Sequence, residues 1–248
     1  MPCVRRMRTV TVTLPSETGR HYGLAYTLWL PDRRPARGAG VVILHGADSS
    51  KESHHDYARL LSASGIGALC FDQRGHGDSD GALDDRAAHD VTVMADLLRD
   101  RLGEPAAPIG LRGSSMGGYM AIVAADSARA QAVVAICPAP AELLRAGLER
   151  RAFAFRADAA RLGRFLDAHD LTGAASRLTA PLLLLHAEGD ERVPVAHSRE
   201  LAEFATAPGS RLIALPGGHH RSIQHDRELQ AVSLRFLQRA LGLRADAG

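Results

Sequence analysis

The segment that most constrains the fold of this chain is Gly-Ser-Ser-Met-Gly at residues 113–117, which has the pattern Gly-x-Ser-x-Gly. Apolar residues precede it at 109–111, and a run of small and apolar residues follows it at 118–125, so a short strand, a sharp turn and a helix are predicted. Such a turn strains the backbone of its middle residue, Ser115, and projects the side-chain oxygen. The glycines are needed because side chains there would collide with the neighbouring strand and helix. By this spacing Ser115, and not Ser114, takes the projecting position. Five residues of this kind also occur by chance, so the interpretation depends on the rest of the chain.

Strand-like and helix-like segments alternate along the chain. Short continuous apolar runs are typical of strands buried on both faces of a parallel sheet, and apolar residues at helical spacing lie between them. Strands are predicted at 9–14, 22–30, 41–44, 65–71, 109–111, 132–136, 181–185 and 211–215, and helices at 53–63, 87–102, 118–125, 196–204 and 223–241. The first two strands are expected to form a hairpin that turns at Thr18-Gly19-Arg20. This order predicts an α/β fold with a mostly parallel, doubly wound sheet and antiparallel strands at its N-terminal edge.

The composition fits one globular domain over residues 1–248. A chain of 248 residues with 46% hydrophobic residues and a mean hydropathy of −0.10 can bury a large core, and it contains no repeat or low-complexity tract. The net charge of +2 comes from interspersed acids and bases, which argues against a nucleic-acid partner. No stretch approaches the ~20 apolar residues of a membrane helix, and no apolar segment follows the basic N-terminus. We therefore expect a cytoplasmic protein without a membrane partner; the oligomeric state is left open.

Cysteine usage indicates neither a disulfide framework nor a metal site. The three cysteines, Cys3, Cys70 and Cys137, are widely spaced and form no Cys-x-x-Cys pair. Cys70 and Cys137 lie in apolar, strand-like runs, where they are expected to be small buried hydrophobic residues.

Residues whose side chains can take part in catalysis directly follow several of the predicted strands. In parallel sheets the functional groups gather at the carboxyl ends of strands. Acyl transfer by a serine needs a nucleophile, a base, an acid that orients the base, and donors for the oxyanion. Asp190 lies on a turn just after the strand at 181–185, and His219-His220 follows the strand at 211–215. The order Ser115, Asp190, His220 is that of a serine, acid and histidine triad on this kind of sheet.

Taken together, these segments resemble the α/β-hydrolase superfamily, and within it the compact esterase and serine-aminopeptidase-like group. The resemblance extends from the strand at 41–44 to the last helix. Its motifs are His45-Gly46, Asp72-x-Arg74-Gly75-His76-Gly77-x-Ser79, Gly113-x-Ser115-x-Gly117, Gly189-Asp190 and Gly217-Gly218-His219-His220. The resemblance implies the α/β-hydrolase fold and an expected activity as a hydrolase.

The resemblance also implies the roles of the site residues. Ser115 would be the nucleophile, His220 the general base and Asp190 the orienting acid. The backbone N–H groups of Ala47 and Met116 would form the oxyanion hole, in which a donor contributes about 3 kcal/mol in the transition state.

Two of these assignments have neighbouring competitors. His219 adjoins His220, and the family pattern Pro-Gly-x-x-His favours His220. Glu188 competes with Asp190, but it lies closer to the strand, before Gly189 makes the turn.

Other histidines receive structural interpretations. The spacings of His54-His55 and His225-Asp226 match no usual metal site, so surface or helix-cap roles are expected. By analogy with the family, His76 is expected to hold its loop by hydrogen bonds, and His45 to do similar work beside the oxyanion segment. His45 and Gly46 are also tentative substrate contacts. No metal and no organic cofactor are expected.

Residues 139–180 form an insert that is expected to supply two or three short helices as a small lid over the site. Phe153 and Phe155 either pack this lid onto the body, which we favour, or face the acyl pocket. Arginines make the insert basic, which is a weak indication of an anionic substrate such as a coenzyme A or carrier-protein thioester; they include Arg145, Arg150, Arg151, Arg156, Arg161 and Arg164.

The expected function is a serine hydrolase that cleaves carboxylic esters of small to medium acyl groups through an acyl-enzyme on Ser115. A thioesterase or an aminopeptidase would use the same machinery and differ only in the pocket. A ligand-binding protein that keeps the fold without catalysis is the alternative from another class.

Overall fold

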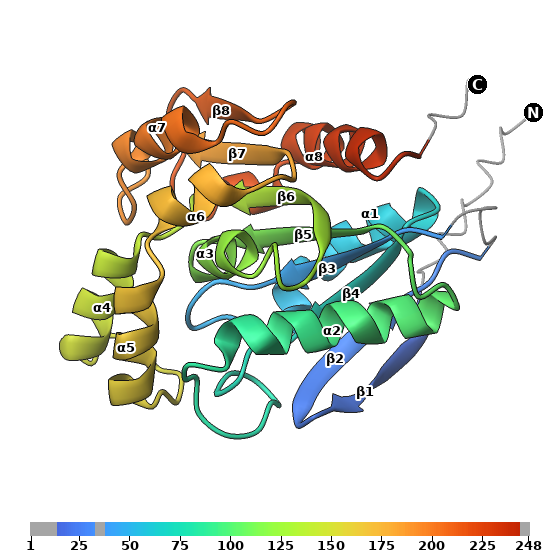
Figure 1. Ribbon diagram of the computed structural model, residues 1–248, viewed down its shortest axis with the longest axis horizontal. Coiled ribbons are helices and arrows are strands. Elements are labelled where there is room, and N and C mark those ends of the chain that lie inside the picture. The colour runs from blue at the N-terminus through green and yellow to red at the C-terminus, as the bar shows by residue number, and fades with distance from the viewer. Residues whose placement is uncertain (1–13, 33–37, 244–248) are drawn as a thin grey trace, which may run out of the picture.

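The computed structural model describes residues 14–32 and 38–243, in which helices surround a central sheet (Figure 1). Eight strands form one sheet in the order β1-β2-β4-β3-β5-β6-β7-β8. Their bounds are β1 Glu17–His21, β2 Leu24–Trp29, β3 Gly40–Leu44, β4 Gly67–Phe71, β5 Ile109–Ser114, β6 Ala130–Ile136, β7 Leu182–Ala187 and β8 Arg211–Leu215. Strands β3 to β8 are parallel, whereas β2 pairs antiparallel with both β1 and β4. The predicted mostly parallel sheet with antiparallel N-terminal strands is confirmed.

Helices connect the strands in the predicted alternation. The α-helices are α1 His55–Ala63, α2 Ala87–Leu102, α3 Met116–Val123, α4 Ala141–Glu149, α5 Ala159–Ala168, α6 Leu171–Arg177, α7 Val195–Phe204 and α8 Arg227–Ala240. Two short 3₁₀ helices, η1 Lys51–His54 and η2 Ile223–His225, precede α1 and α8. No helix within the described ranges has the length and apolar character needed to cross a membrane.

The core lies in two layers because alternate residues of each strand face opposite sides of the sheet. In β3, Val42 and Leu44 belong to the cluster under α2 and α3, whereas Val41 and Ile43 belong to the cluster under α1 and α8. Both layers are buried, which explains why the central strands appear in the sequence as unbroken apolar runs.

The N-terminal hairpin corrects one prediction. Thr18, Gly19 and Arg20 lie inside β1 rather than in a turn, and the chain reverses at Tyr22-Gly23. Both turn residues have positive φ angles, 49° and 78°, as in the two-residue turns that match the twist of a β-hairpin. Gly19, which the sequence predicts at the turn, is a strand residue against which the Tyr26 ring packs. The strand predicted at 9–14 lies outside the described residues except for Leu14, and Cys3 lies outside them too.

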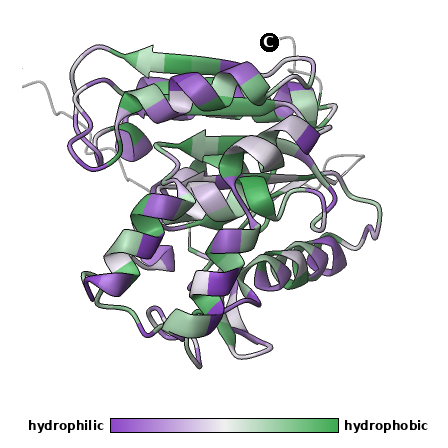
Figure 2. Cartoon of the chain, turned by 60° about the vertical axis from the view of Figure 1, so that its left-hand side comes forward, coloured by the Kyte–Doolittle hydropathy of each residue, from purple (hydrophilic) through white to green (hydrophobic). Residues whose placement is uncertain are grey.

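Helices α4, α5 and α6 occupy the segment between β6 and β7, and α4 and α5 lie together at the left of Figure 1. The hydropathy colouring of Figure 2 shows hydrophilic and hydrophobic residues mixed along the helices. In α5 the apolar positions Leu162, Phe165 and Leu166 are buried in the core cluster. These helices therefore pack on the body through one apolar side.

Candidate active site

Ser115 lies at the junction of β5 and α3 in a strained backbone conformation. Its φ and ψ are 54° and −118°, outside the usual regions for a residue with a side chain. A Cβ atom on Gly113 would lie 2.0 Å from the carbonyl oxygen of Gly117, and one on Gly117 would lie 2.4 Å from that of Leu44. Only glycine fits at both flanking positions, so the predicted tight turn is present and Ser115 lines the adjoining cleft.

Asp190 and His220 form a hydrogen-bonded pair beside that cleft. The Nδ1–H of His220 donates to Oδ2 of Asp190 at 2.7 Å, and the Asp190 side chain has no exposed surface. The backbone N–H groups of Arg192 and Val193 donate to the other carboxylate oxygen, each at 2.8 Å. Burial alone would raise the pKa of Asp190, but hydrogen bonds from His186, His220 and these backbone groups outweigh it and hold the pKa well below its usual value. Asp190 is therefore ionised at neutral pH.

The competing residues have other partners. Glu188 pairs with Arg199 at 2.5 Å, and His219 is exposed, with its backbone N–H donating to Ser222 at 3.0 Å. Because the proton of His220 on Nδ1 is held by Asp190, its Nε2 is left as the acceptor, which is the tautomer that a general base requires.

Ser115 and His220 line the same cleft, which has a volume of about 510 Å³. Within the described part of the chain, no hydrogen bond joins Ser115 to His220. In enzymes without bound substrate, the distance between a serine and its base is commonly long, and it shortens when substrate binds. An arrangement of this kind can activate a serine for attack on a carbonyl. The roles of the three residues stay predictions.

Of the two residues predicted for the oxyanion hole, one lines the cleft and the other follows Ser115 in the chain. Ala47 lines the cleft, and Met116 begins α3 directly after Ser115. Neither backbone N–H group has an acceptor within the described part of the chain. Free N–H groups at a helix start are suited to bind a negatively charged oxygen.

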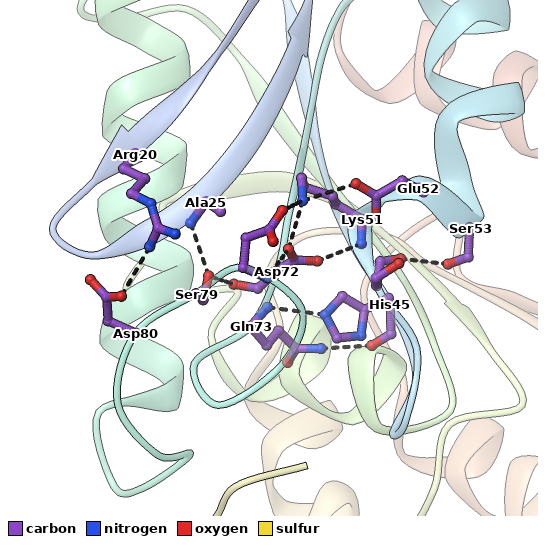
Figure 3. A network of polar contacts seen from close by, with 12 residues as sticks. Arg20, Ala25, His45, Lys51, Glu52, Ser53, Asp72, Gln73, Ser79 and Asp80 are labelled. Carbon is purple, nitrogen blue, oxygen red and sulfur yellow. Dashed lines mark hydrogen bonds and ion pairs between the residues drawn. The ribbon is translucent and has the colours of Figure 1, made fainter. Parts of the chain in front are cut away.

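A polar network fixes the loop that carries Ala47 to the loop after β4 (Figure 3). Asp72, at the end of β4, has no exposed surface and accepts hydrogen bonds from the backbone N–H and the Nζ of Lys51, both at 2.7 Å. Gln73 donates its backbone N–H to Nε2 of His45 and its amide to the carbonyl oxygen of His45. Lys51, the only lysine of the chain, is thus a buried structural cation.

Removing this cation should destabilise the fold. We expect Lys51→Met to lower the free energy of unfolding by about 3 kcal/mol, because it leaves the Asp72 carboxylate buried without its counter-ion. Arg20→Met is the matched control: it breaks the Arg20–Asp80 pair, whose side chains are 52% and 68% exposed, and should cost less than about 1 kcal/mol. Urea unfolding measures both. Equal losses in the two variants would contradict the structural role of Lys51.

His45 and His76 lie behind the cleft. The side chain of His45 is fully buried and does not reach the cleft, so the geometry does not support its tentative place among the substrate contacts, whereas Gly46 lines the cleft. The Nδ1–H of His76 donates a hydrogen bond to the carbonyl oxygen of Arg74 within its own loop, and the ring stacks on Phe155. These contacts agree with a structural role for both histidines.

Acid should weaken the fold through His45. Burial and the neighbouring His76 lower the pKa of His45 from 6.5 to about 4. Between these values the unfolded chain binds a proton that the folded chain does not, so the free energy of unfolding falls as the pH falls, by up to about 1.4 kcal/mol per pH unit. We expect urea midpoints to drop from pH 7 to pH 5, and to drop less in His45→Gln. An equal pH slope in both proteins would contradict this account.

Phe153 and Phe155 lie between the insert and the body. Phe153 lines both the cleft and a separate apolar cavity of about 10 Å³, whereas Phe155 lines only the cavity. The two rings stack at 5.1 Å. The position of Phe155 thus agrees with a role in packing the insert onto the body, whereas Phe153 contacts both the cleft and the apolar cavity.

Sequence reasoning missed a buried polar cluster that includes Arg112 of β5. His54 was expected at the surface or as a helix cap; it precedes α1, but its side chain is buried and forms no cap. Its ring lies 3.4 Å from the guanidinium of Arg112 and 3.5 Å from Oγ of Ser114. Arg112 is 1% exposed and stacks on the ring of Tyr57. A charged residue inside an otherwise apolar strand was the available signal.

One group among the described residues has the spacing of metal ligands. Ligand atoms of Cys137, Asp190 and His220 lie within 4.8 Å of one another. Burial raises the pKa of the Cys137 thiol, so the thiolate that binds metals is disfavoured. Asp190 and His220 also bind each other, and the donor set therefore fits an acid–base pair better than a metal site.

Known proteins resemble this chain in sequence and in fold. A model of the family described as serine aminopeptidase, S33, matches residues 35–167, just over half of the chain. The chain is 28% identical to a monoacylglycerol lipase of Mycolicibacterium smegmatis, over 79% of this chain and 85% of the relative. It is 26% identical to the mouse lysophosphatidylserine lipase ABHD12, over 91% of this chain and 62% of the relative.

Solved structures share the fold. A monoacylglycerol lipase from Paleococcus ferrophilus superposes with a TM-score of 0.67 at 22% identity, covering 88% of this chain and 98% of that one. A monoglyceride lipase from Saccharomyces cerevisiae superposes with a TM-score of 0.72 at 15% identity, covering 95% and 96%. The chain therefore belongs to the serine aminopeptidase S33 family of the α/β-hydrolase superfamily, a superfamily of hydrolases.

Proposed function

We propose that this hydrolase cleaves carboxylic esters through an acyl-enzyme on Ser115. The observation that carries the proposal is the Asp190–His220 hydrogen bond of 2.7 Å at a cleft that the strained Ser115 also lines. Relatives named as lipases of monoacylglycerol and lysophosphatidylserine support ester substrates.

In this proposal the reaction has two steps. His220 takes the proton of Ser115 as Oγ attacks the ester carbonyl, and the backbone N–H groups of Ala47 and Met116 hold the oxyanion. His220 passes the proton to the leaving oxygen as the ester C–O bond breaks, which releases the alcohol. Water, deprotonated by the same histidine, then attacks the acyl-enzyme, and His220 returns that proton to Oγ of Ser115 as the acyl C–Oγ bond breaks and the acid is released.

The lining and size of the cleft support a preference for short to medium acyl groups. Its apolar wall comes from the insert and includes Leu143, Leu144 and Phe153. The apolar cavity behind Phe153 measures only about 10 Å³, so a long chain would have to displace that ring. In this proposal the chain is one catalytic domain, and residues 139–180 form its lid.

An aminopeptidase would need an anionic group to hold the substrate ammonium. Within residues 14–32 and 38–243, Asp48 is the one carboxylate that lines the cleft, and its Oδ1 already accepts the N–H of Ala154 at 2.7 Å. Three arginines line the same cleft, so the charge opposes an ammonium group. Ester hydrolysis is therefore favoured within the family.

The test is hydrolysis of p-nitrophenyl esters of increasing acyl length, with alanine p-nitroanilide as the amide comparison. We expect ester turnover to peak at about four to eight carbons and amide turnover to be at least tenfold slower. Covalent labelling of the wild-type protein by a fluorophosphonate should accompany the ester activity. Absence of both turnover and labelling would support a ligand-binding protein instead.

A further inference from the structure

The arginines of the insert do not form one basic surface. Arg145 pairs with Glu149 and Asp167, and Arg161 pairs with Asp84 and Asp85. Among the arginines of the insert, only Arg150 lines the cleft.

Two further arginines line the cleft from the loops that carry the acid and the histidine. Arg192 follows Asp190 by two residues, and Arg221 directly follows His220. We call Arg150, Arg192 and Arg221 the cationic rim. All three are exposed.

The cationic rim is poorly neutralised within the described ranges. Arg150 and Arg221 have no carboxylate within 4.0 Å, and Arg192 has only its neighbour Glu191, at 4.0 Å. Asp48 is the single acidic side chain in the lining. Three arginines and one carboxylate line the cleft, so the lining carries a net positive charge; the carboxylates of Asp190 and Glu191 contact His220 from outside that lining.

The position of this charge identifies the part of the substrate that meets it. A histidine in this role must give its proton to the leaving oxygen, so the leaving group lies on the side of His220. Arg192 and Arg221 belong to the two loops on that side, whereas the apolar wall at Leu144 and Phe153 is available to the acyl group.

Resting on the proposed ester hydrolysis, we propose that the natural leaving group carries a phosphate, which the cationic rim binds. A phosphate brings a charge of about −1.5 to −2 and several acceptor oxygens, and guanidinium groups bind such oxygens in pairs. One phosphate can engage more than one arginine, which suits a rim of three.

The experiment compares kcat/KM for butyryl esters that differ in the charge of the alcohol. The anionic substrate is 1-butyryl-glycerol 3-phosphate, the neutral one is monobutyrin and the cationic one is butyrylcholine. We expect the anionic ester to exceed the neutral one by about tenfold, the cationic ester to be slowest, and the preference to shrink in 1 M NaCl. Butyryl-coenzyme A against the butyryl thioester of N-acetylcysteamine distinguishes a nucleotide source of the phosphate from a glycerol source.

Variants assign the preference to the rim. In Arg192→Gln/Arg221→Gln the anionic-to-neutral ratio should fall about fivefold or more, and in Arg150→Gln it should fall less. Arg235→Gln, on the exposed side of α8, is the matched control and should retain the wild-type ratio. Hydrolysis of all three esters with no charge preference, or a preference that the rim variants keep, overturns the inference and leaves the ester hydrolase standing. Absence of hydrolysis of every ester overturns the proposed function itself.

Discussion

Replacing Ser115 with alanine is expected to lower kcat by about 10⁴-fold or more while the fold persists. The substitution removes the oxygen that would form the acyl-enzyme, and loss of the nucleophile in serine hydrolases leaves only the contribution of the oxyanion hole and binding. Alanine keeps the Cβ that the turn already accommodates, so its φ of 54° is no more strained than that of serine. Ester turnover and the urea midpoint of the variant measure the two parts of this expectation.

Ser114→Ala is the control for this experiment. Ser114 adjoins Ser115 and also lines the cleft, but its Oγ lies 3.5 Å from Nε2 of the buried His54 rather than beside His220. We expect it to retain most of the turnover and to react with a fluorophosphonate as the wild type does. Comparable losses in both variants would contradict the assignment of Ser115 as the projecting residue.

The fold was predictable because its signals are local. Strands β3 to β7 are buried on both faces over most of their length and therefore appear in the sequence as apolar runs, whereas the edge strand β8 is only half-buried. Helix α2 was predicted at the bounds it has, Ala87–Leu102. The predicted position of the hairpin turn was wrong because the turn contains Tyr22 at a positive φ, a conformation that is uncommon for tyrosine and gives no signal in the sequence. Gly19, the residue that suggested a turn, lies within a strand.

Candidate site residues could be predicted where a chemically reactive side chain directly follows a predicted strand. Asp190 and His220 were chosen from residues that follow two strands, and the structure brings them within 2.7 Å. Other contacts between segments that are distant in the sequence could not be predicted in this way, because no sequence pattern marks them. The Lys51–Asp72 pair, the His54–Arg112 contact and the cationic rim each join residues from segments that are far apart in the sequence, so they can be found only once the strands are placed side by side.

Asp190→Asn should lower kcat for ester hydrolysis by about 10³- to 10⁴-fold with a smaller effect on KM. Asp190 holds the Nδ1–H of His220, and an amide in its place can offer its own N–H there and favour the wrong tautomer of the histidine. It also removes a carboxylate whose low pKa keeps it charged at the pH of the assay, so no charge would remain to stabilise the protonated histidine. Steady-state kinetics on a p-nitrophenyl ester measures the loss.

Glu188→Gln provides the comparison at the competing carboxylate. Glu188 pairs with Arg199 at the surface, so this variant should keep kcat within about threefold of the wild type. A large loss in Glu188→Gln together with a mild one in Asp190→Asn would exchange the two acids. Because Asp190 also accepts the N–H groups of Arg192 and Val193, the asparagine variant should be examined for a lower urea midpoint as well. A kcat loss that persists at a temperature where the variant is fully folded belongs to the histidine and not to the loop.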